Sequence, residues 1–334
     1  MLKPSSYHSY EKSLIKQGEQ GMSVSDRHRY RREKLLEAGK IASKALAFTC
    51  SQVAAGVLLL TIAKSGEQRI RELGGEPAFP VNISINHHAA HYTPALEDVS
   101  TVPELALVKI DLGAHVHGYI ADNARTVLVG KDEKLQNLVL AAEAGLQAAI
   151  QTIRAGLRIW KVSKAISGAI RQFKARPIEN LTGHSIEAFN LHSGVAVPSV
   201  ARSGERFTSP RLKEKMVVAI EPFTTYSGQP NVENLEPGHI FGFARSRNPS
   251  NSKLRNLFSQ MKVKFAQLPF ASRWMTEFVE PDQISHTLET LQKEGCIHNF
   301  PVLGLQDGSF VAQAEHTIIV EQTGCTITTR RPNE

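Results

Sequence analysis

A stretch that predicts a β-hairpin with two acidic residues constrains the fold of this chain most strongly. It covers residues 109–126, where apolar or β-branched residues flank both Asp111 and Asp122. His117-Gly118 lies near its midpoint and suits a tight turn between two strands. A chain that folds back there brings the two carboxylates close together on one face. Two anions so close repel each other unless a proton or a cation lies between them, and hard oxygen ligands favour a divalent metal.

The composition is that of an ordinary globular protein. With 334 residues, 41% of them apolar, the chain is long enough for a large core and two structural units. The longest apolar run, residues 54–63, is too short to cross a bilayer, and the polar N-terminus shows no signal-peptide pattern. Cys50, Cys296 and Cys325 show no paired spacing, which argues against a disulfide framework. We therefore expect a cytoplasmic monomer that binds neither membranes nor DNA.

The net charge of +7 is concentrated in two segments. Residues 1–40 carry nine Lys/Arg against five Asp/Glu, and residues 243–275 carry seven Lys/Arg and no acidic residue. This charge could serve solubility. It could also attract RNA, for example at a ribosome surface, and the sequence leaves both open.

The pattern along the chain divides it into three parts. Residues 1–24 have no periodic apolar pattern, and we expect a flexible basic extension there. Residues 25–242 and 306–334 form the expected main domain. Residues 243–305 interrupt it with helical patterns and prolines, which predicts an inserted helical subdomain. No internal repeat is evident by eye.

Apolar periodicity and turn residues predict the individual elements. Ser25 is expected to cap the first helix, and a second helix is expected to end at Gly74-Gly75. The second helix and its successors are expected over residues 51–73, 133–153, 160–175, 252–266 and 282–294. The clearest strands are expected over residues 81–85, 106–112, 119–129, 216–220 and 310–320.

Three further stretches place metal-ligand residues in strand-like settings. The first holds His184 and, a few residues on, His192. The second ends an apolar strand with Glu221, which is unusual unless something pairs with that carboxylate. The third holds Glu315, which in an extended strand would share one polar face with Gln313 and Thr317.

Together these stretches supply five side chains with oxygen or nitrogen donors: Asp111, Asp122, His184, Glu221 and Glu315. Such an oxygen-rich set can hold two metal ions about 3–4 Å apart with bridging carboxylates. Each residue alone is unremarkable, because a single strand carboxylate is usually on the surface and a single histidine is usually satisfied in the core. Their occurrence together favours a metal site.

These residues also carry a family resemblance. The matching segments are residues 79–84, 89–94, 111–122, 183–187, 219–223, 268–270 and 314–319. In this order they resemble the type II methionine aminopeptidases, most closely the archaeal form, over about residues 28–325. The resemblance implies the pita-bread fold of the creatinase and aminopeptidase family, an α+β arrangement of two pseudo-symmetric halves around a central antiparallel sheet. It also implies that residues 243–305 are the type II insertion, whose helices resemble a winged-helix module.

The resemblance implies a role for each ligand. Asp122 and Glu315 would bridge two divalent ions, Asp111 would hold one, and His184 and Glu221 would hold the other. Cobalt, manganese, iron, zinc and nickel all suit such a set, and the sequence does not identify the native metal.

The resemblance further implies a substrate site. His91 and His192 match two histidines of that site that are not metal ligands. The apolar pocket for a methionine side chain would be formed by four residues, Phe79, Leu191, His239 and Phe300.

The implied function is the removal of the N-terminal methionine from nascent polypeptides whose second residue is small. We hypothesise that a metal-activated water attacks, with Glu221 as general base, while His192 stabilises charge on the scissile carbonyl. The partners would be nascent peptide N-termini and, through the basic surface, the ribosome. Two alternative functions stay open: a non-catalytic binding protein on the same fold, or an Xaa-Pro peptidase.

Some positions depart from the family pattern. His87 and His88 stand where less basic residues are expected and could bind an additional ion or be incidental. Ala314 stands where phenylalanine is common, which predicts looser packing behind Glu315.

Overall fold

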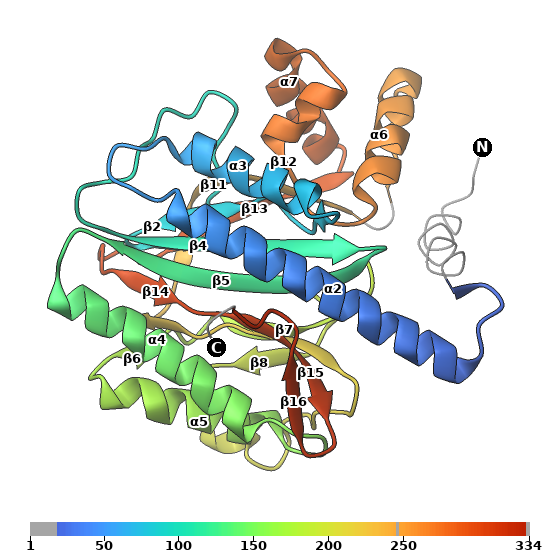
Figure 1. The fold of residues 1–334 in the computed structure, drawn as a ribbon. Coiled ribbons are helices and arrows are strands. Elements are labelled where there is room, and N and C mark those ends of the chain that lie inside the picture. The colour runs from blue at the N-terminus through green and yellow to red at the C-terminus, as the bar shows by residue number, and fades with distance from the viewer. Residues whose placement is uncertain (1–18, 245–246, 332–334) are drawn as a thin grey trace.

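The computed structural model describes residues 19–244 and 247–331 (Figure 1). Most of the expected N-terminal extension, residues 1–18, lies outside this range. The described end is fixed in place: Glu19 is buried and accepts hydrogen bonds from Arg31 (2.7 Å) and the Tyr119 hydroxyl (2.6 Å). Within the described residues, no helix combines the length and apolar character that a membrane crossing requires.

The first half packs two helices against an antiparallel sheet. Its strands are β1 (Glu76–Pro77), β2 (Asn82–Ile85), β4 (Ala106–Val116) and β5 (Tyr119–Val129), in the order β1-β4-β2 with β5 paired to β4. Helices α2 (Val24–Ser51) and α3 (Leu59–Glu72) cover one face (Figure 1). Alanines and a glycine on the buried side of α2 allow close approach, and a Cβ at Gly39 would lie 2.1 Å from the Thr328 carbonyl oxygen.

The expected hairpin is β4–β5, and its register is set by the turn. Val116 pairs with Tyr119, so only His117 and Gly118 form the loop. Both have positive φ, +52° and +85°, which is the conformation of a two-residue turn that matches strand twist. A side chain at the second position would collide with the Phe189 ring, so the glycine is required for space as well as for its backbone angle.

The second half repeats the first. Helices α4 (Glu133–Thr152) and α5 (Ile159–Gln172) correspond to α2 and α3, and β6 (Arg176–Pro177) corresponds to β1. Gly56 and Gly156 both have φ of +78° in the loop before the shorter helix, and each donates its N–H to a carbonyl 2.8 Å away. This repeat agrees with the two pseudo-symmetric halves that the family resemblance implies, although none is evident by eye in the sequence. The repeat escapes the eye because the halves share mainly glycines and buried apolar positions.

The second half contains a five-stranded sheet with the strand order β16-β15-β9-β7-β8. These strands are β7 (Thr182–Ile186), β8 (Ala196–Pro198), β9 (Val217–Ile220), β15 (His316–Glu321) and β16 (Gly324–Ile327). A smaller sheet, β14-β10-β6, contains β10 (Phe223–Thr225) and β14 (Val311–Gln313). The largest apolar core lies between these sheets and α4 and α5.

Two helices interrupt the second half at the top of Figure 1. Helices α6 (Ser252–Phe265) and α7 (Ile284–Lys293) lie between β11 (Glu233–Phe243) and β13 (Ile297–Gly304), which are hydrogen-bonded neighbours. The same sheet contains β3 (His88–Ala90) and β12 (Phe270–Ala271). Three short 3-10 helices cover Ser203–Glu205, Ser272–Glu277 and Pro281–Gln283. The helices have their own core, with Phe258, Phe265 and Phe270 at its centre. A separate inserted subdomain over residues 243–305 remains our proposal.

Three expected boundaries were wrong. Ser23, rather than Ser25, caps α2, because its hydroxyl accepts the Asp26 N–H at 3.1 Å. The second helix begins at Leu59 because Gly56 turns the chain and Leu58 forms a β-bridge with Thr101.

The third error concerns the strand expected over residues 310–320. It is divided into β14 and β15, because Ala314 forms a bridge with Arg125, outside either strand, and the Glu315 N–H donates to Ala124.

Candidate metal centre

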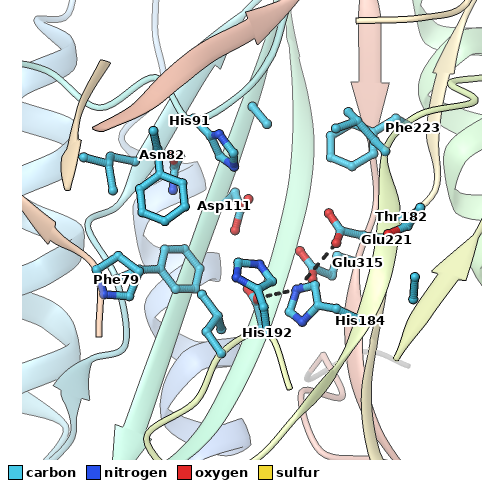
Figure 2. A pocket seen from close by; sticks show the side chains of 18 of the residues that line it. Phe79, Asn82, His91, Asp111, Thr182, His184, His192, Glu221, Phe223 and Glu315 are labelled. Atoms are coloured by element: carbon cyan, nitrogen blue, oxygen red, sulfur yellow. Dashed lines mark ion pairs between the residues drawn. The ribbon is translucent and has the colours of Figure 1, made fainter. Parts of the chain in front are cut away.

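The structure brings the five predicted ligand side chains together in one cavity of about 390 Å³ between the two halves (Figure 2). Asp111 and Asp122 come from the hairpin of the first half. His184 lies on β7, Glu221 follows β9, and Glu315 lies between β14 and β15. Residues far apart in sequence thus line a single site.

The strand register explains why the two aspartates face the same way. Asp111 lies opposite Ala124, and Asp122 lies opposite Gly113. The two acids are therefore diagonal neighbours on one face of the hairpin, the arrangement in which long or charged side chains interact. The hairpin prediction placed them correctly.

The second half supplies a histidine and a carboxylate from neighbouring strands. His184 pairs with Ala219, two residues before Glu221. The His184 Nε2 lies 3.5 Å from Glu221 Oε1 and 3.6 Å from Asp122 Oδ2, the two contacts that Figure 2 marks with dashed lines. The close fit of β7 against β9 needs Gly183, because a Cβ there would lie 2.4 Å from the Ala219 carbonyl oxygen.

Glu315 reaches the cluster from the break between β14 and β15. Its N–H donates to the Ala124 carbonyl at 3.1 Å, which joins the C-terminal segment to the hairpin. Gln313 and Thr317 lie on the same side, as expected: Gln313 Nε2 is 3.5 Å from Glu315 Oε2, and the Thr317 hydroxyl donates to the Asp122 carbonyl.

Burial raises the pKa values of all four carboxyl groups, and repulsion between neighbours raises three of them further. Burial raises the pKa of Asp111 to about 7. Burial first, and then the neighbouring carboxylates, raise the pKa values of Asp122, Glu221 and Glu315 well above their usual range. Burial and the neighbouring His192 lower the pKa of His184 to about 3, so this imidazole is neutral and can donate a lone pair.

The donor atoms fit a divalent metal. Three buried carboxylate oxygens of the cluster have no hydrogen-bond partner among the described residues: Asp111 Oδ1, Asp122 Oδ1 and Glu315 Oε1. The ligand atoms of Asp122, His184 and Glu315 all lie within 4.8 Å of one another. Buried carboxylates that repel each other and lack hydrogen-bond donors are stabilised by a cation. Three oxygen donors and a neutral imidazole also suit first-row transition metals.

His91 and His192 lie at the rim of this cluster without being in its group of ligand atoms. His91 has a positive φ of +66°, and its Nδ1 lies 3.3 Å from the Pro301 carbonyl oxygen. Burial lowers its pKa to about 4. His192 lies with its ring centroid 4.3 Å from that of His184 and keeps an exposed surface, although the protein around it lowers its pKa.

The apolar side of the cavity contains three of the four expected pocket residues, Phe79, Leu191 and Phe300. His239 does not line it. Its neighbour Ile240 does, because alternate residues of β11 face opposite sides, and the His239 Nδ1 lies 3.2 Å from the Ser272 hydroxyl instead. The expected pocket role of His239 therefore has no support in this geometry.

His87 and His88 do not join a second metal-binding group among the described residues. Their rings lie 4.4 Å apart, and His88 stacks on Tyr92 at 5.6 Å.

The sequence pattern alone did not reveal a buried lysine beside the ligands. Lys109 is fully buried on the same strand as Asp111, and its Nζ donates to the carbonyls of Asn86 (3.0 Å) and Val311 (2.9 Å). Burial lowers its pKa. These contacts fix β4 against β14, which leads to Glu315. A lysine inside an apolar strand is the signal that could have found it.

Comparison with known proteins decides the family. Residues 33–248 match the model of metallopeptidase family M24. The chain belongs to this family. It is 43% identical over 298 residues to a methionine aminopeptidase of Thermococcus onnurineus, a match that covers 89% of this chain and 99% of that protein. A methionine aminopeptidase of Pyrococcus horikoshii is 42% identical over 297 residues, with the same coverage of 89% and 99%.

Solved structures of M24 and related proteins share the fold. A thermophilic Arx1 superposes with a TM-score of 0.78 at 16% identity, over 93% of this chain and 92% of that one. A methionine aminopeptidase of Thermotoga maritima gives 0.63 at 22% identity, over 90% and 96%. A prolidase of Pyrococcus furiosus gives 0.55 at 17% identity, over 90% of this chain and 64% of that one.

These findings confirm the expected resemblance, the pita-bread fold and the assignment to a family of metal-dependent peptidases. They do not distinguish which side chains of this M24 member bind metal. That assignment comes from the geometry of the cavity.

Proposed function

We propose that the protein removes the N-terminal methionine from polypeptides whose second residue is small. The main support for this proposal is the lining of one cavity. Five side chains that can bind metal and two further histidines border it, together with the apolar side chains of Phe79, Leu191 and Phe300. The near-full-length similarity to archaeal methionine aminopeptidases supports the same substrate. An acyl-chain or nucleotide substrate would not need this combination of ligands and small apolar space.

We infer that Asp111, Asp122, His184, Glu221 and Glu315 would hold two divalent ions. The four carboxylates support two ions, because together they carry enough negative charge to balance them. Cobalt, manganese, iron, zinc and nickel all suit these donors. When bound, the metal supplies Lewis acidity, which makes a water molecule a stronger nucleophile at neutral pH.

Glu221 is the residue that we assign as general base. It lies next to His184, outside the close group of ligand atoms of Asp122, His184 and Glu315, and its side chain borders the cavity. A carboxylate in this position can take a proton from water and later give it to the leaving amine.

The hydrogen bond of His91 assigns its tautomer. The Pro301 carbonyl can only accept, so the His91 Nδ1 carries the proton. The lowered pKa keeps the ring neutral, which leaves Nε2 as an acceptor. We infer that His91 accepts a hydrogen bond from an N–H of the substrate next to the scissile bond. Neutral His192, with an N–H to donate, would stabilise charge on the scissile carbonyl oxygen.

The cavity walls explain the proposed preference for methionine at the first residue. A thioether against the rings of Phe79 and Phe300 is a favourable contact. A volume of about 390 Å³ is large enough to hold a methionine residue.

We also infer the cellular compartment, the partners and the oligomeric state of the protein. Cys50, Cys296 and Cys325 are all free thiols, which fits a reducing compartment such as the cytoplasm. Nascent chains would be the substrates. The lysines and arginines of α6 offer a basic surface for ribosome association. A monomer remains our expectation.

The decisive experiment offers two tripeptides to the manganese-loaded protein. Met-Ala-Ser should release methionine, and Met-Leu-Ser should release at least about tenfold less, since one oversized side chain in a fitted site costs on the order of 1–3 kcal/mol. Release from neither peptide, with metal bound, would contradict the proposal. Cleavage of Gly-Pro or Ala-Pro-Ala in preference would point to an Xaa-Pro peptidase instead.

A further inference from the structure

A large groove adjoins the metal cavity and is used by nothing described so far. Its volume is about 1520 Å³, and it lies between the N-terminal part of α2, the turn after β7 and the helices between β11 and β13. Four residues line both spaces: Leu191, His192, Pro269 and Phe300. A polypeptide whose first residue fills the metal cavity therefore enters the groove directly past His192.

The groove combines an apolar floor with a basic rim. Leu35, Ile120, Ile186 and Ile319 are buried residues that contribute to the floor. Six lysines and arginines line the groove against two glutamates, Glu187 and Glu321. The cations come from two sides: Arg29, Arg31 and Arg32 on α2, and Lys215, Arg247 and Lys262 elsewhere on the rim.

The two sides differ in how much of their charge is already balanced. Each arginine on α2 has a carboxylate partner: Asp26 for Arg29 (2.7 Å), Glu19 for Arg31 (2.7 Å) and Glu321 for Arg32 (2.6 Å). Lys262 lies over the Phe258 ring at 4.3 Å and has lost part of its hydration through burial. Lys215 and Arg247 are both exposed. Neither of these two side chains forms an ion pair among the described residues, so Lys215 and Arg247 carry positive charge on the rim that no carboxylate of the protein balances.

We propose that this groove binds the substrate polypeptide beyond its second residue and favours acidic side chains there. The proposal rests on the methionine aminopeptidase function proposed above and extends it from the first two residues to the following segment. A polypeptide fits better than RNA, because the groove opens into the cavity where a peptide bond is cut and its floor is apolar. Acidic side chains complement the unbalanced rim, and alternate apolar residues suit the floor.

The test uses three decapeptides that begin Met-Ala-Ser-Gly and continue with four aspartates, four serines or four lysines before two glycines. The manganese-loaded full-length protein should cleave the aspartate peptide with a kcat/KM about three- to tenfold above the lysine peptide at 20 mM salt. At 0.5 M salt the ratio should approach one, because exposed charges are then screened. The effect should lie in KM rather than kcat, because these residues are far from the reacting bond.

Paired variants assign the preference to the groove. In the double variant Lys215→Glu/Arg247→Glu the aspartate-to-lysine ratio should fall to one or invert. A matched variant with the same charge change on exposed helix surfaces outside the groove, Lys64→Glu/Lys161→Glu, should retain the wild-type ratio. Loss of the ratio in both variants would mean that net charge alone causes it and would overturn the proposal.

The outcomes separate this proposal from the function on which it rests. If Met-Ala-Ser is cleaved but the three decapeptides have equal kcat/KM values, the groove proposal is wrong and the peptidase proposal stands. If Met-Ala-Ser is not cleaved, the function itself fails. If the decapeptides are equal and a fluorescent single-stranded RNA binds the wild type but not the groove variant, the basic rim serves a nucleic acid instead.

Discussion

Four carboxyl groups that line one small cavity destabilise the folded protein when no cation is present. The pKa values of these carboxyl groups are raised in the folded protein, that of Asp111 to about 7. Without metal, the folded protein therefore keeps protons on these groups at pH values where the unfolded chain has released them. Ionising these carboxyl groups raises the free energy of the folded state but not that of the unfolded chain.

This cost predicts a pH dependence with a definite sign. The Asp111 carboxyl group titrates near pH 4 in the unfolded chain and its pKa is raised to about 7 in the folded protein, and the pKa values of the other three are raised in the same direction. Their contribution to stability is therefore complete below pH 4 and is lost as pH rises through 7. Between pH 5 and 8 the free energy of unfolding of the metal-free protein should fall by roughly 2–4 kcal/mol. Chemical denaturation at several pH values measures it. In Asp111→Asn the slope should be shallower, and an unchanged slope would remove these groups as its cause.

A second prediction at this scale concerns His192. It lies beside His184 but outside the cluster of ligand atoms. His192→Ala should lower kcat about 10²-fold, the usual cost of losing one donor to a developing oxyanion, and leave metal content unchanged. His184→Ala is the comparison, since it should lose metal. Metal analysis and kinetics on both variants measure the difference, and metal loss in His192→Ala would show that it is a ligand.

Single residues varied in how far sequence could predict them. Asp111 and Asp122 were predictable, because a two-residue turn at His117-Gly118 fixes both onto one face. The positive φ of His91 was not, because it depends on contacts with β13, more than two hundred residues later. His239 was misplaced for the opposite reason: family resemblance gives a position but not the face of the strand.

At the scale of elements, the pairing of β7 with β9 controls the second pair of ligands. Gly183→Ala would put a methyl group 2.4 Å from the Ala219 carbonyl oxygen and separate the two strands that carry His184 and Glu221. We expect metal affinity to fall at least about tenfold, as it does when a supporting contact of a ligand is lost. Calorimetric titration measures it. Gly168→Ala on α5 is the control, because nothing lies within 4 Å of its Cβ, and it should bind metal normally.

A buried ion pair anchors the segment between α6 and α7 to the first half. Arg273 pairs with Glu67 of α3 and also donates to the Thr93 hydroxyl and the Pro94 carbonyl at 2.8 Å. Arg273→Met would leave Glu67 buried without its cation, which should cost about 3–5 kcal/mol of stability. Thermal unfolding tests this. The double variant Glu67→Gln/Arg273→Met should recover part of the loss, and equal loss in both would mean that packing, rather than charge, holds this contact.

Element types followed from sequence more reliably than element ends. Strand β5 was predicted over its whole length because its apolar and β-branched residues lie between two turn signals, His117-Gly118 and Gly130. The start of α3 and the division between β14 and β15 were not, because each is set by a bridge to a distant segment: Leu58 with Thr101, and Ala314 with Arg125. Local propensity contains no information about such partners.

At the scale of the whole molecule, the metal site joins both halves and the C-terminal strand. Metal should therefore stabilise the entire fold rather than one element. At a free metal concentration one hundred times the dissociation constant, stability should rise by about 2.7 kcal/mol. Differential scanning calorimetry with and without manganese at pH 7.5 measures this as one transition that moves upwards. Two transitions, of which only one moves, would show that the halves unfold independently.

The position of Glu315 late in the chain has a consequence for biosynthesis. Four ligands are made by residue 221, but the fifth arrives only after α6, α7 and β13 have been translated. A partly synthesised copy therefore folds around an unbalanced acidic cavity and has no working centre. A new molecule becomes active only when β14 and β15 have packed against the hairpin. A translation product that ends before these strands is therefore inactive.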